Sequence, residues 1–397
     1  MLPRVKITFE NGLIGATDPI DDGVAGMICN GSAVTGKLAL LTAYLITSLD
    51  DLAALGITNG ESDANKHIYK AVQEFYAEAP EGSKLWLYVV ADTNTMAQML
   101  DKDGTIGNAF INATNGDVKI LTIVRKAASG YTPTIADGLD SDVFAAAAKA
   151  QALAEWAVDN KYAPFLSILP GLSYSGTASA LSDLTEYSYN RVGILIGDTT
   201  SNSDDACVGL LLGRIASIPV QRSIARVKTG AIKNTALYIK DKVAEDGDPD
   251  VIHDAGYICP RTFVGKAGYY WSDDKLATSS SDDYALIPRR RTIDKAFRIA
   301  YKTLIEELSN EIALTSAGKI PAMVCKSLES EVETAVSSGM NGELGVDPDD
   351  QTDTGVQCYI DSDQVVVNTQ QVNVKLRVKP FGYLKYIDVY LGFKVNE

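Results

Sequence analysis

Residues 31–37 are the part of this chain whose types and spacing most resemble a catalytic motif. They read GSAVTGK, beginning with Gly31 and ending with Lys37, after an apolar run that reads as a buried strand. This spacing matches a phosphate-binding loop, in which backbone N–H groups and the lysine contact phosphates and the next hydroxyl holds magnesium. Leu38 stands where that hydroxyl is needed, so the metal anchor for phosphoryl transfer is missing. A glycine turn after a strand explains the same residues, and a P-loop-like nucleotide-binding protein stays open as an alternative function.

Other residue types that could do chemistry are few and scattered. The chain has two histidines, His67 and His253, so a Ser-His-Asp site could be built only around one of them. Ser173 lies in PGLSYSG, which is not a GxSxG motif. The acidic loops at 246–250 and 347–353 lack the glycine and glutamate positions of a twelve-residue calcium loop. We therefore expect a protein that is not an enzyme and has no catalytic residues, no metal and no cofactor.

Charge and cysteine content exclude several classes of partner. The net charge of −15 disfavours nucleic acid and anionic membranes, which need a basic surface. The one basic cluster, at 289–291, is better explained as an anchor or salt-bridge site at the start of a helix. Five scattered cysteines without a CxxC motif fit reduced thiols in a cytosolic protein. No apolar run is long enough to span a membrane, and the first residues lack a signal-peptide core.

Strand patterns alternate with helix patterns over much of the chain. Expected strands lie at 24–29, 85–90, 118–124, 165–169 and 192–196. Expected helices lie at 48–56, 64–79, 142–160, 180–188 and 206–217. This alternation predicts an α/β domain with a mostly parallel sheet.

With 397 residues, the chain is too long for one small core, so two or three domains are expected. We place an N-terminal strand arm and hinge, with Asp18-Pro19, at 1–23 and an outer α/β domain at 24–283. The stretch from about 225 to 283 is polar and poorly placed. A C-terminal α+β domain at 284–397 would carry amphipathic helices at 292–308 and 322–337 and end in antiparallel strands.

Both ends of the chain alternate apolar and polar residues with the period of a strand. Near the start the apolar positions are Val5, Ile7 and Phe9. Near the end, alternation runs over 372–379 and resumes after Pro380 and Gly382 with the apolar positions Ile387, Val389, Leu391 and Phe393. Apolar terminal strands need a sheet to join, so either the chain polymerises by strand exchange or both ends pair inside one subunit.

Taken together, these parts make the chain resemble tail sheath proteins of contractile phage tails, R-type pyocins and related contractile injection systems. The resemblance rests on VAGMICNGSAVTGKLALLTAYLITSLDDLAALG at 24–56, on RRRTIDKAFRIAYKTLIEEL at 289–308, and on the strands at both ends. The order of parts agrees over nearly the whole chain. It departs from the better-known sheaths over about 225–285.

The resemblance implies a structural subunit that stacks as hexameric rings around an inner tube. Extended N- and C-terminal arms would add strands to the sheets of neighbouring C-terminal domains, and contraction would drive the tube through a target envelope. The implied partners are other copies of the chain, an inner tail tube protein, and baseplate and tail terminator proteins, without nucleic acid or membrane insertion. Assembly would take place in the bacterial cytoplasm, and the product would be a phage tail or a phage-tail-like particle.

The resemblance also suggests where contacts between subunits lie. The intersubunit sheets would hold two sets of apolar residues, Val5, Ile7 and Phe9 and Ile387, Val389, Leu391 and Phe393. By analogy, a helix of the C-terminal domain would face the tube, either the acidic helix at 322–337 with Glu329, Glu331 and Glu333 or the helix at 292–308. A non-contractile structural or adhesive protein is the second alternative function, and it would pair its terminal strands within one subunit.

Overall fold

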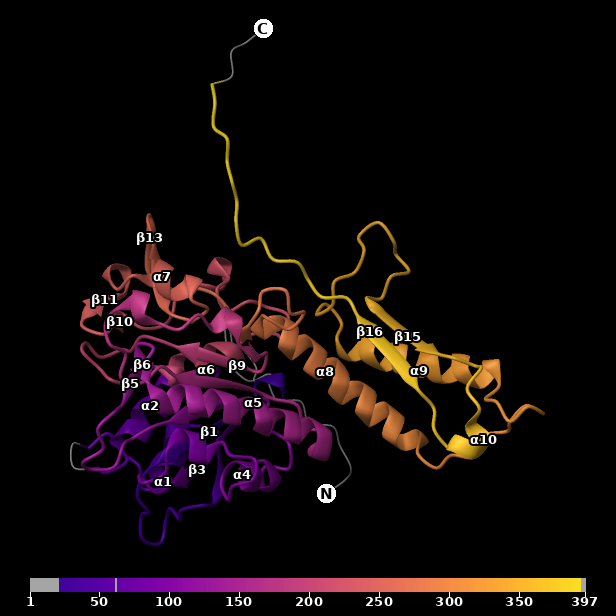
Figure 1. Ribbon diagram of the computed structural model, residues 1–397, viewed down its shortest axis with the longest axis horizontal. Helices are drawn as coiled ribbons and strands as arrows, with labels where there is room; N and C mark the ends of the chain where they lie inside the picture. The colour runs from indigo at the N-terminus through magenta and orange to yellow at the C-terminus, as the bar shows by residue number, and fades with distance from the viewer. Residues whose placement is uncertain (1–20, 61–62, 394–397) are drawn as a thin grey trace, which may run out of the picture. The chain divides into compact units, whose positions relative to one another are not determined.

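A computed structural model describes residues 21–60 and 63–393 of the chain. It divides into two compact units, Met1–Asp294 and Lys295–Glu397, which are described separately (Figure 1). The expected N-terminal strand with Val5, Ile7 and Phe9, and the Asp18-Pro19 hinge, lie outside the described residues. Within the described ranges, no helix is long and apolar enough to cross a membrane.

A six-stranded sheet forms the centre of the first unit, in the order β2-β3-β1-β4-β7-β9. The strands are β1 Ala25–Asn30, β2 Ala43–Ile46, β3 Leu85–Val90, β4 Ile120–Val124, β7 Leu166–Pro170 and β9 Val192–Leu195. Only β2, at one edge, runs antiparallel to its neighbour, and the other pairs are parallel. The predicted α/β fold with a mostly parallel sheet is therefore confirmed.

Helices cover both faces of this sheet (Figure 1). One core joins the sheet to α1 Leu49–Ala54, α2 Lys66–Glu78 and α6 Val208–Ala216. The other joins it to α3 Met96–Met99, α4 Gly107–Ala113 and α5 Ser141–Lys161. Neighbouring residues of a strand point to opposite faces, so Met27 lies in the first core and Ile28 in the second. Burial on both faces explains why these strands read as continuous apolar runs.

Local signals placed most of these elements correctly, with one error. At the start of α1, the side chain of Ser48 accepts a hydrogen bond from the backbone N–H of Asp51, as the capping pattern predicts. The helix predicted at 180–188 is wrong, because this stretch forms the turns η2 Ala178–Ala180 and η3 Leu184–Glu186 and the short strand β8 Ser188–Tyr189. The carboxylate of Asp183 accepts from both the N–H and the hydroxyl of Thr185. Such side-chain bonds compete with the hydrogen bonds of a helix.

The stretch that sequence patterns could not place belongs to the first unit. Its elements are η4 Val227–Thr229, β10 Tyr238–Ile239, β11 Lys242–Val243, η5 Ala244–Asp246, α7 Pro249–Asp254, β12 Pro260–Phe263, β13 Lys266–Trp271 and β14 Ala277–Thr278. Two short strands from earlier in the chain, β5 Ile135–Ala136 and β6 Leu139–Asp140, form a separate hairpin. Ile258 joins the free side of β9, where the N–H of Ile196 donates to its carbonyl at 2.9 Å. The stretch thus extends the edge of the central sheet.

Two glycines allow α6 to lie directly against the backbone of α2. A Cβ atom at Gly209 or Gly213 would overlap the carbonyl oxygens of Ala71 and Phe75, respectively. We expect Gly213→Ala to destabilise the chain by about 1–3 kcal/mol despite the better helix propensity of alanine, because a helix backbone cannot yield locally. Urea denaturation measures this difference. In the control Gly60→Ala, the nearest atom to the new Cβ is the Thr58 hydroxyl at 3.4 Å, and an equal loss of stability there would contradict the argument.

The second unit is a small α+β domain. The division between the units falls within α8 Ile287–Leu304, which is followed by η6 Ile305–Glu307, α9 Ala322–Gly339, β15 Val356–Ile360, α10 Val366–Thr369 and β16 Val374–Val378. Strands β15 and β16 form a two-stranded antiparallel sheet, with Val356 opposite Val378. Cys325 of α9 and Ile360 of β15 share a small core. Both amphipathic helices of this region are confirmed, whereas β15 was not predicted.

Candidate assembly site

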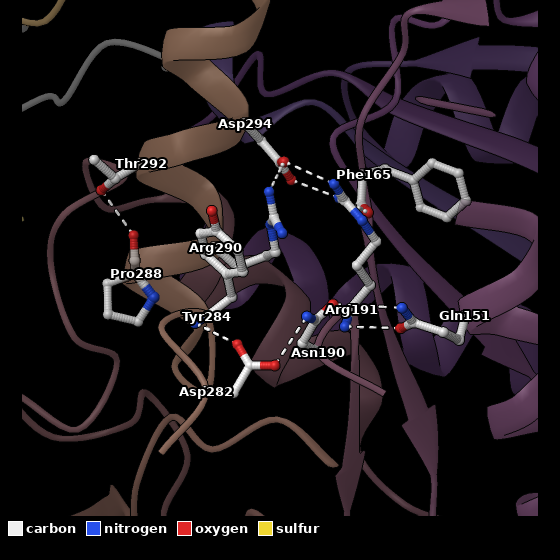
Figure 2. Close-up of polar contacts among 10 residues, drawn as sticks. All are labelled: Gln151, Phe165, Asn190, Arg191, Asp282, Tyr284, Pro288, Arg290, Thr292 and Asp294. Atoms are coloured by element: carbon white, nitrogen blue, oxygen red, sulfur yellow. Dashed lines mark hydrogen bonds and ion pairs between the residues drawn. The ribbon is translucent and has the colours of Figure 1, made fainter. Parts of the chain in front are cut away.

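The first turns of α8 are fastened to the α/β domain by a buried charge network (Figure 2). Arg191, just before β9, donates to both carboxylate oxygens of Asp294 at 2.9 and 3.1 Å and to the carbonyl of Phe165 at 3.0 Å. Arg290 donates to the same carboxylate at 2.7 Å, one helical turn before it. Burial lowers the pKa of the Arg290 guanidinium, although nearby Asp294 opposes this shift. The network therefore holds two buried cations on one carboxylate.

Neighbouring residues complete this anchor. The ring of Tyr284 lies 4.3 Å from the guanidinium carbon of Arg290, and Arg291 donates to the carbonyl of Ile218 at 3.1 and 3.2 Å. Two residues of the basic cluster at 289–291, Arg290 and Arg291, thus contact the chain's own residues, as expected for an anchor at the start of a helix.

The phosphate-loop spacing at 31–37 does not lead to a phosphate-loop geometry. Such a loop opens directly into a helix, whose N-terminus faces the phosphates. Here the loop closes through paired hydrogen bonds between Val34 and Leu38, and the next element is the edge strand β2. Inside the loop, the N–H of Ser32 is already bound to the side chain of Asn65 at 2.8 Å. The geometry therefore contradicts the P-loop-like alternative, and a glycine turn between two strands explains the motif.

Neither histidine is hydrogen-bonded to a serine among the contacts of the described residues. Burial lowers the pKa of His67, whose Nε2 lies 2.7 Å from the carbonyl of Asn30. His253 lies 3.1 Å from each of two carboxylates, those of Asp254 and Asp273. No cluster of metal-ligating side chains occurs within the part of the chain that the structure describes.

A buried acidic cluster lies where β9 ends. Lys70 of α2 pairs with Asp198 at 2.6 Å and lies 3.7 Å from Glu74, which also accepts from the Thr199 hydroxyl. Burial raises the pKa of the Glu74 carboxyl to about 7 and that of Asp205 to about 6. The cluster thus has more carboxylates than cations when it is fully ionised.

This cluster should make the stability of the chain depend on pH. The folded state holds the Glu74 proton more tightly than the unfolded state, so the free energy of unfolding should rise as pH falls from about 7 toward the ordinary value of 4.5. Glu74→Gln should reduce the change in the free energy of unfolding over this pH range by up to about 3 kcal/mol, because one pKa unit corresponds to about 1.4 kcal/mol. Urea denaturation at a series of pH values tests this, with exposed Glu81→Gln as control. An unchanged pH profile for Glu74→Gln would contradict the assignment.

The C-terminal segment, residues 383–393, has no strand partner among residues 21–60 and 63–393. The preceding strand, β16, pairs with β15. Figure 1 shows the terminal segment as an extended trace without an arrow. Its apolar side chains, Ile387, Val389, Leu391 and Phe393, are between 74% and 104% exposed. The partner of this segment, in its own subunit or in another copy, therefore stays a prediction.

Two hydrogen bonds hold the chain on this course where β16 ends. The N–H of Lys379 donates to the carbonyl of Gly355, and its carbonyl accepts from the N–H of Gly345, both at 2.8 Å. Pro380 follows directly. These contacts continue the β15 side of the pairing by one residue and fix the point at which the chain leaves the sheet.

Two of the three glutamates expected on a tube-facing surface point to their own sheet. Glu329 is 4% exposed, and its carboxylate accepts from the N–H of Ile360 at 2.7 Å. Glu333 accepts from the N–H of Cys358 at 2.7 Å. Only Glu331 is exposed. This corrects the residue set, because the helix face that contacts β15 carries both carboxylates. Which helix faces a tube remains a prediction.

Comparisons with known proteins agree with this architecture. The family descriptions DUF2586, N-terminal domain, and DUF2586, C-terminal domain, match residues 2–275 and 283–397. No curated protein matches the chain.

Solved structures with a similar fold come from contractile sheaths. The helical sheath of the anti-feeding prophage in its contracted state has a TM-score of 0.63 at 12% identity, over 99% of each chain. The sheath complex of an extracellular contractile injection system, PVC, has a TM-score of 0.62 at 15% identity, over 100% of this chain and 98% of that one. A sheath tail protein from Listeria innocua has a TM-score of 0.52 at 9% identity, over 89% and 91%. The chain therefore has the fold of contractile sheath proteins, as the sequence resemblance predicts.

Proposed function

The chain belongs to the DUF2586 family, and we propose that it is a structural subunit of a contractile tail sheath. The observation that carries this proposal is the exposed, alternating segment at 383–393, which lies outside every sheet of the part of the chain that the structure describes. It occurs in a chain with the fold of sheath proteins. A terminal segment with four large exposed apolar side chains gains most by adding to the sheet of another copy.

In this proposal, copies of the chain stack as hexameric rings around an inner tube. Each copy places its terminal segments in the second unit of a neighbour, and the main-chain hydrogen bonds of the added strands link the subunits. A contact between two different surfaces of the subunit produces a helical assembly when its repetition does not close into a ring. During contraction the added strands would keep subunits connected while the bodies rotate. The partners are then other copies, the tube protein, and baseplate and terminator proteins of a phage tail or tail-like particle assembled in the bacterial cytoplasm.

The buried anchor of α8 suits such a role. Contraction loads each subunit mechanically, and Asp294 connects the start of α8 to Arg191 beside β9. The network would let the first turns of the helix move with the α/β domain as one body.

Electron microscopy of negatively stained protein tests the proposal. The concentrated full chain should form striated hollow cylinders, alone or co-expressed with the tube protein encoded beside it. A non-contractile adhesive or structural protein would give discrete particles or smooth fibres in both samples, and either outcome would overturn the sheath assignment.

A further inference from the structure

The outward backbone groups at the two edges of the β15–β16 sheet have different hydrogen-bond partners. In an antiparallel pair, alternate residues of a strand direct their backbone groups to the partner strand and to the outer edge. The N–H groups of Cys358 and Ile360 are bound by carboxylates of α9, so they mark the outer edge of β15. The register then directs the backbone groups of Leu376, opposite Cys358, to the outer edge of β16. No strand lies along that edge within residues 21–60 and 63–393.

Building on the proposed sheath function, we propose that Glu329 and Glu333 close the outer edge of β15 to strand addition. The segment 383–393 of a second copy therefore adds to the open edge of β16. The glutamates lie one helical turn apart on α9, which matches the spacing of two outward N–H groups along β15. They act as a side-chain substitute for a neighbouring strand.

Displacing these carboxylates would be unfavourable for an incoming strand. Hydrogen bonds from N–H groups to carboxylates are stronger than those to carbonyl oxygens. Glu329 is additionally held by an ion pair between its second oxygen and Lys326. A strand that added to β15 would exchange two charge-assisted bonds for neutral ones and leave a buried carboxylate with one fewer donor. At the outer edge of β16, no carboxylate of the described residues accepts from the backbone in this way.

The terminal segment of a second copy fits the open edge in pattern and charge. Val374, Leu376 and Val378 are half-buried on the α9 side of the sheet, whereas Lys375 and Arg377 are exposed on the other side. An added strand with Ile387, Val389 and Leu391 on the α9 side extends the apolar surface. The same alternation places Asp388 on the side of the two cations, where opposite charges on adjacent strands attract.

Hydrogen exchange of the unassembled full chain tests the closed edge directly. Replacing both Glu329 and Glu333 with alanine should make the amides of Cys358 and Ile360 exchange at least about tenfold faster, because their acceptors are removed. The glutamine double variant keeps the acceptor oxygens and should retain the protection. Exposed Glu331→Ala removes the same charge without touching β15 and should change neither amide. Unchanged exchange in the alanine double variant would overturn the inference.

A single variant keeps this test available if the alanine pair does not fold. Glu333 is only partly buried, so Glu333→Ala removes one acceptor with less disturbance of the core. Faster exchange confined to Cys358 would support the closed edge, and unchanged exchange would overturn it.

Disulfide cross-linking between copies identifies the edge that accepts the strand. Lys375→Cys on β16 and Tyr359→Cys on β15 are matched probes, since the two exposed residues lie directly opposite each other. The second copy carries Cys in place of Tyr386, Asp388 or Tyr390, tested one at a time. All five native cysteines are buried, which limits background reaction. We expect links to Lys375→Cys only, and links to Tyr359→Cys once both glutamates are replaced with alanine.

The outcomes separate this inference from the sheath proposal. Links to Tyr359→Cys in chains with intact glutamates would overturn the closed edge and leave strand exchange standing. Absence of such links after alanine replacement would show that the carboxylates do not select the edge. Links at neither probe would overturn both the inference and C-terminal strand exchange between copies. This holds even if hydrogen exchange shows that the amides of Cys358 and Ile360 are protected.

Discussion

Val389→Asp is expected to raise the protein concentration needed for polymerisation at least about 100-fold, while the α/β domain stays folded. Burying an unpaired carboxylate in an added strand costs several kcal/mol, and each 1.4 kcal/mol corresponds to a factor of ten. In the isolated chain Val389 is 77% exposed, so the same change should cost the folded subunit almost nothing. Sedimentation of assembled material over a concentration series measures the effect.

Tyr390→Asp is the matched control for this prediction. Tyr390 is 97% exposed and lies on the opposite face of the alternating segment, which an added strand would leave toward solvent. Its substitution introduces the same charge one residue away and should have a much smaller effect. Equal loss of assembly in both variants would show that charge, rather than the buried face of a strand, decides polymerisation. Normal filament yield with Val389→Asp would contradict C-terminal strand exchange.

Asp294→Asn should destabilise the first unit by about 3–5 kcal/mol, since removing one partner of a buried ion pair leaves uncompensated charge. Here one carboxylate serves two buried guanidinium groups, those of Arg191 and Arg290. All three tryptophans, Trp86, Trp156 and Trp271, belong to this unit, so their fluorescence during urea denaturation reports its unfolding.

Asp283→Asn provides the comparison for this second effect. It makes the same chemical change at an exposed aspartate close in sequence to the anchor. Its unfolding midpoint should remain near that of the unchanged chain. If Asp294→Asn unfolded at the same urea concentration as Asp283→Asn, the network would contribute no net stability. The start of α8 would then be held by packing alone.

Local sequence patterns were sufficient where one element carries its own signal. Strands β1, β3, β4, β7 and β9 were predicted because burial on both faces demands continuous apolar runs. The start of α1 was predicted because its capping bond joins residues three positions apart. The helix expected at 180–188 failed because Thr185 donates its N–H and its hydroxyl to the carboxylate of Asp183, and these bonds, which periodicity does not reveal, favour a turn.

Elements that depend on distant partners escaped this reasoning. Ile258 joins the sheet only through its pairing with β9, more than sixty positions earlier in the chain. Strand β15 shows a short alternation at Val356, Cys358 and Ile360 that could have been recognised. The partner of β15 could not be chosen from that pattern, because β16 and the segment that follows it both alternate apolar and polar residues.

By itself, the sequence determined which segments can form strands and helices, and it identified a terminal segment too apolar to remain unpaired in an assembly. Only the tertiary structure decided that this segment lies outside every sheet formed by residues 21–60 and 63–393, because β16 is already paired with β15. It also decided that Glu329 and Glu333 face a strand edge rather than solvent. The physical reason is that periodicity records which faces are apolar, whereas the pairing of backbone groups depends on contacts between residues far apart in the chain.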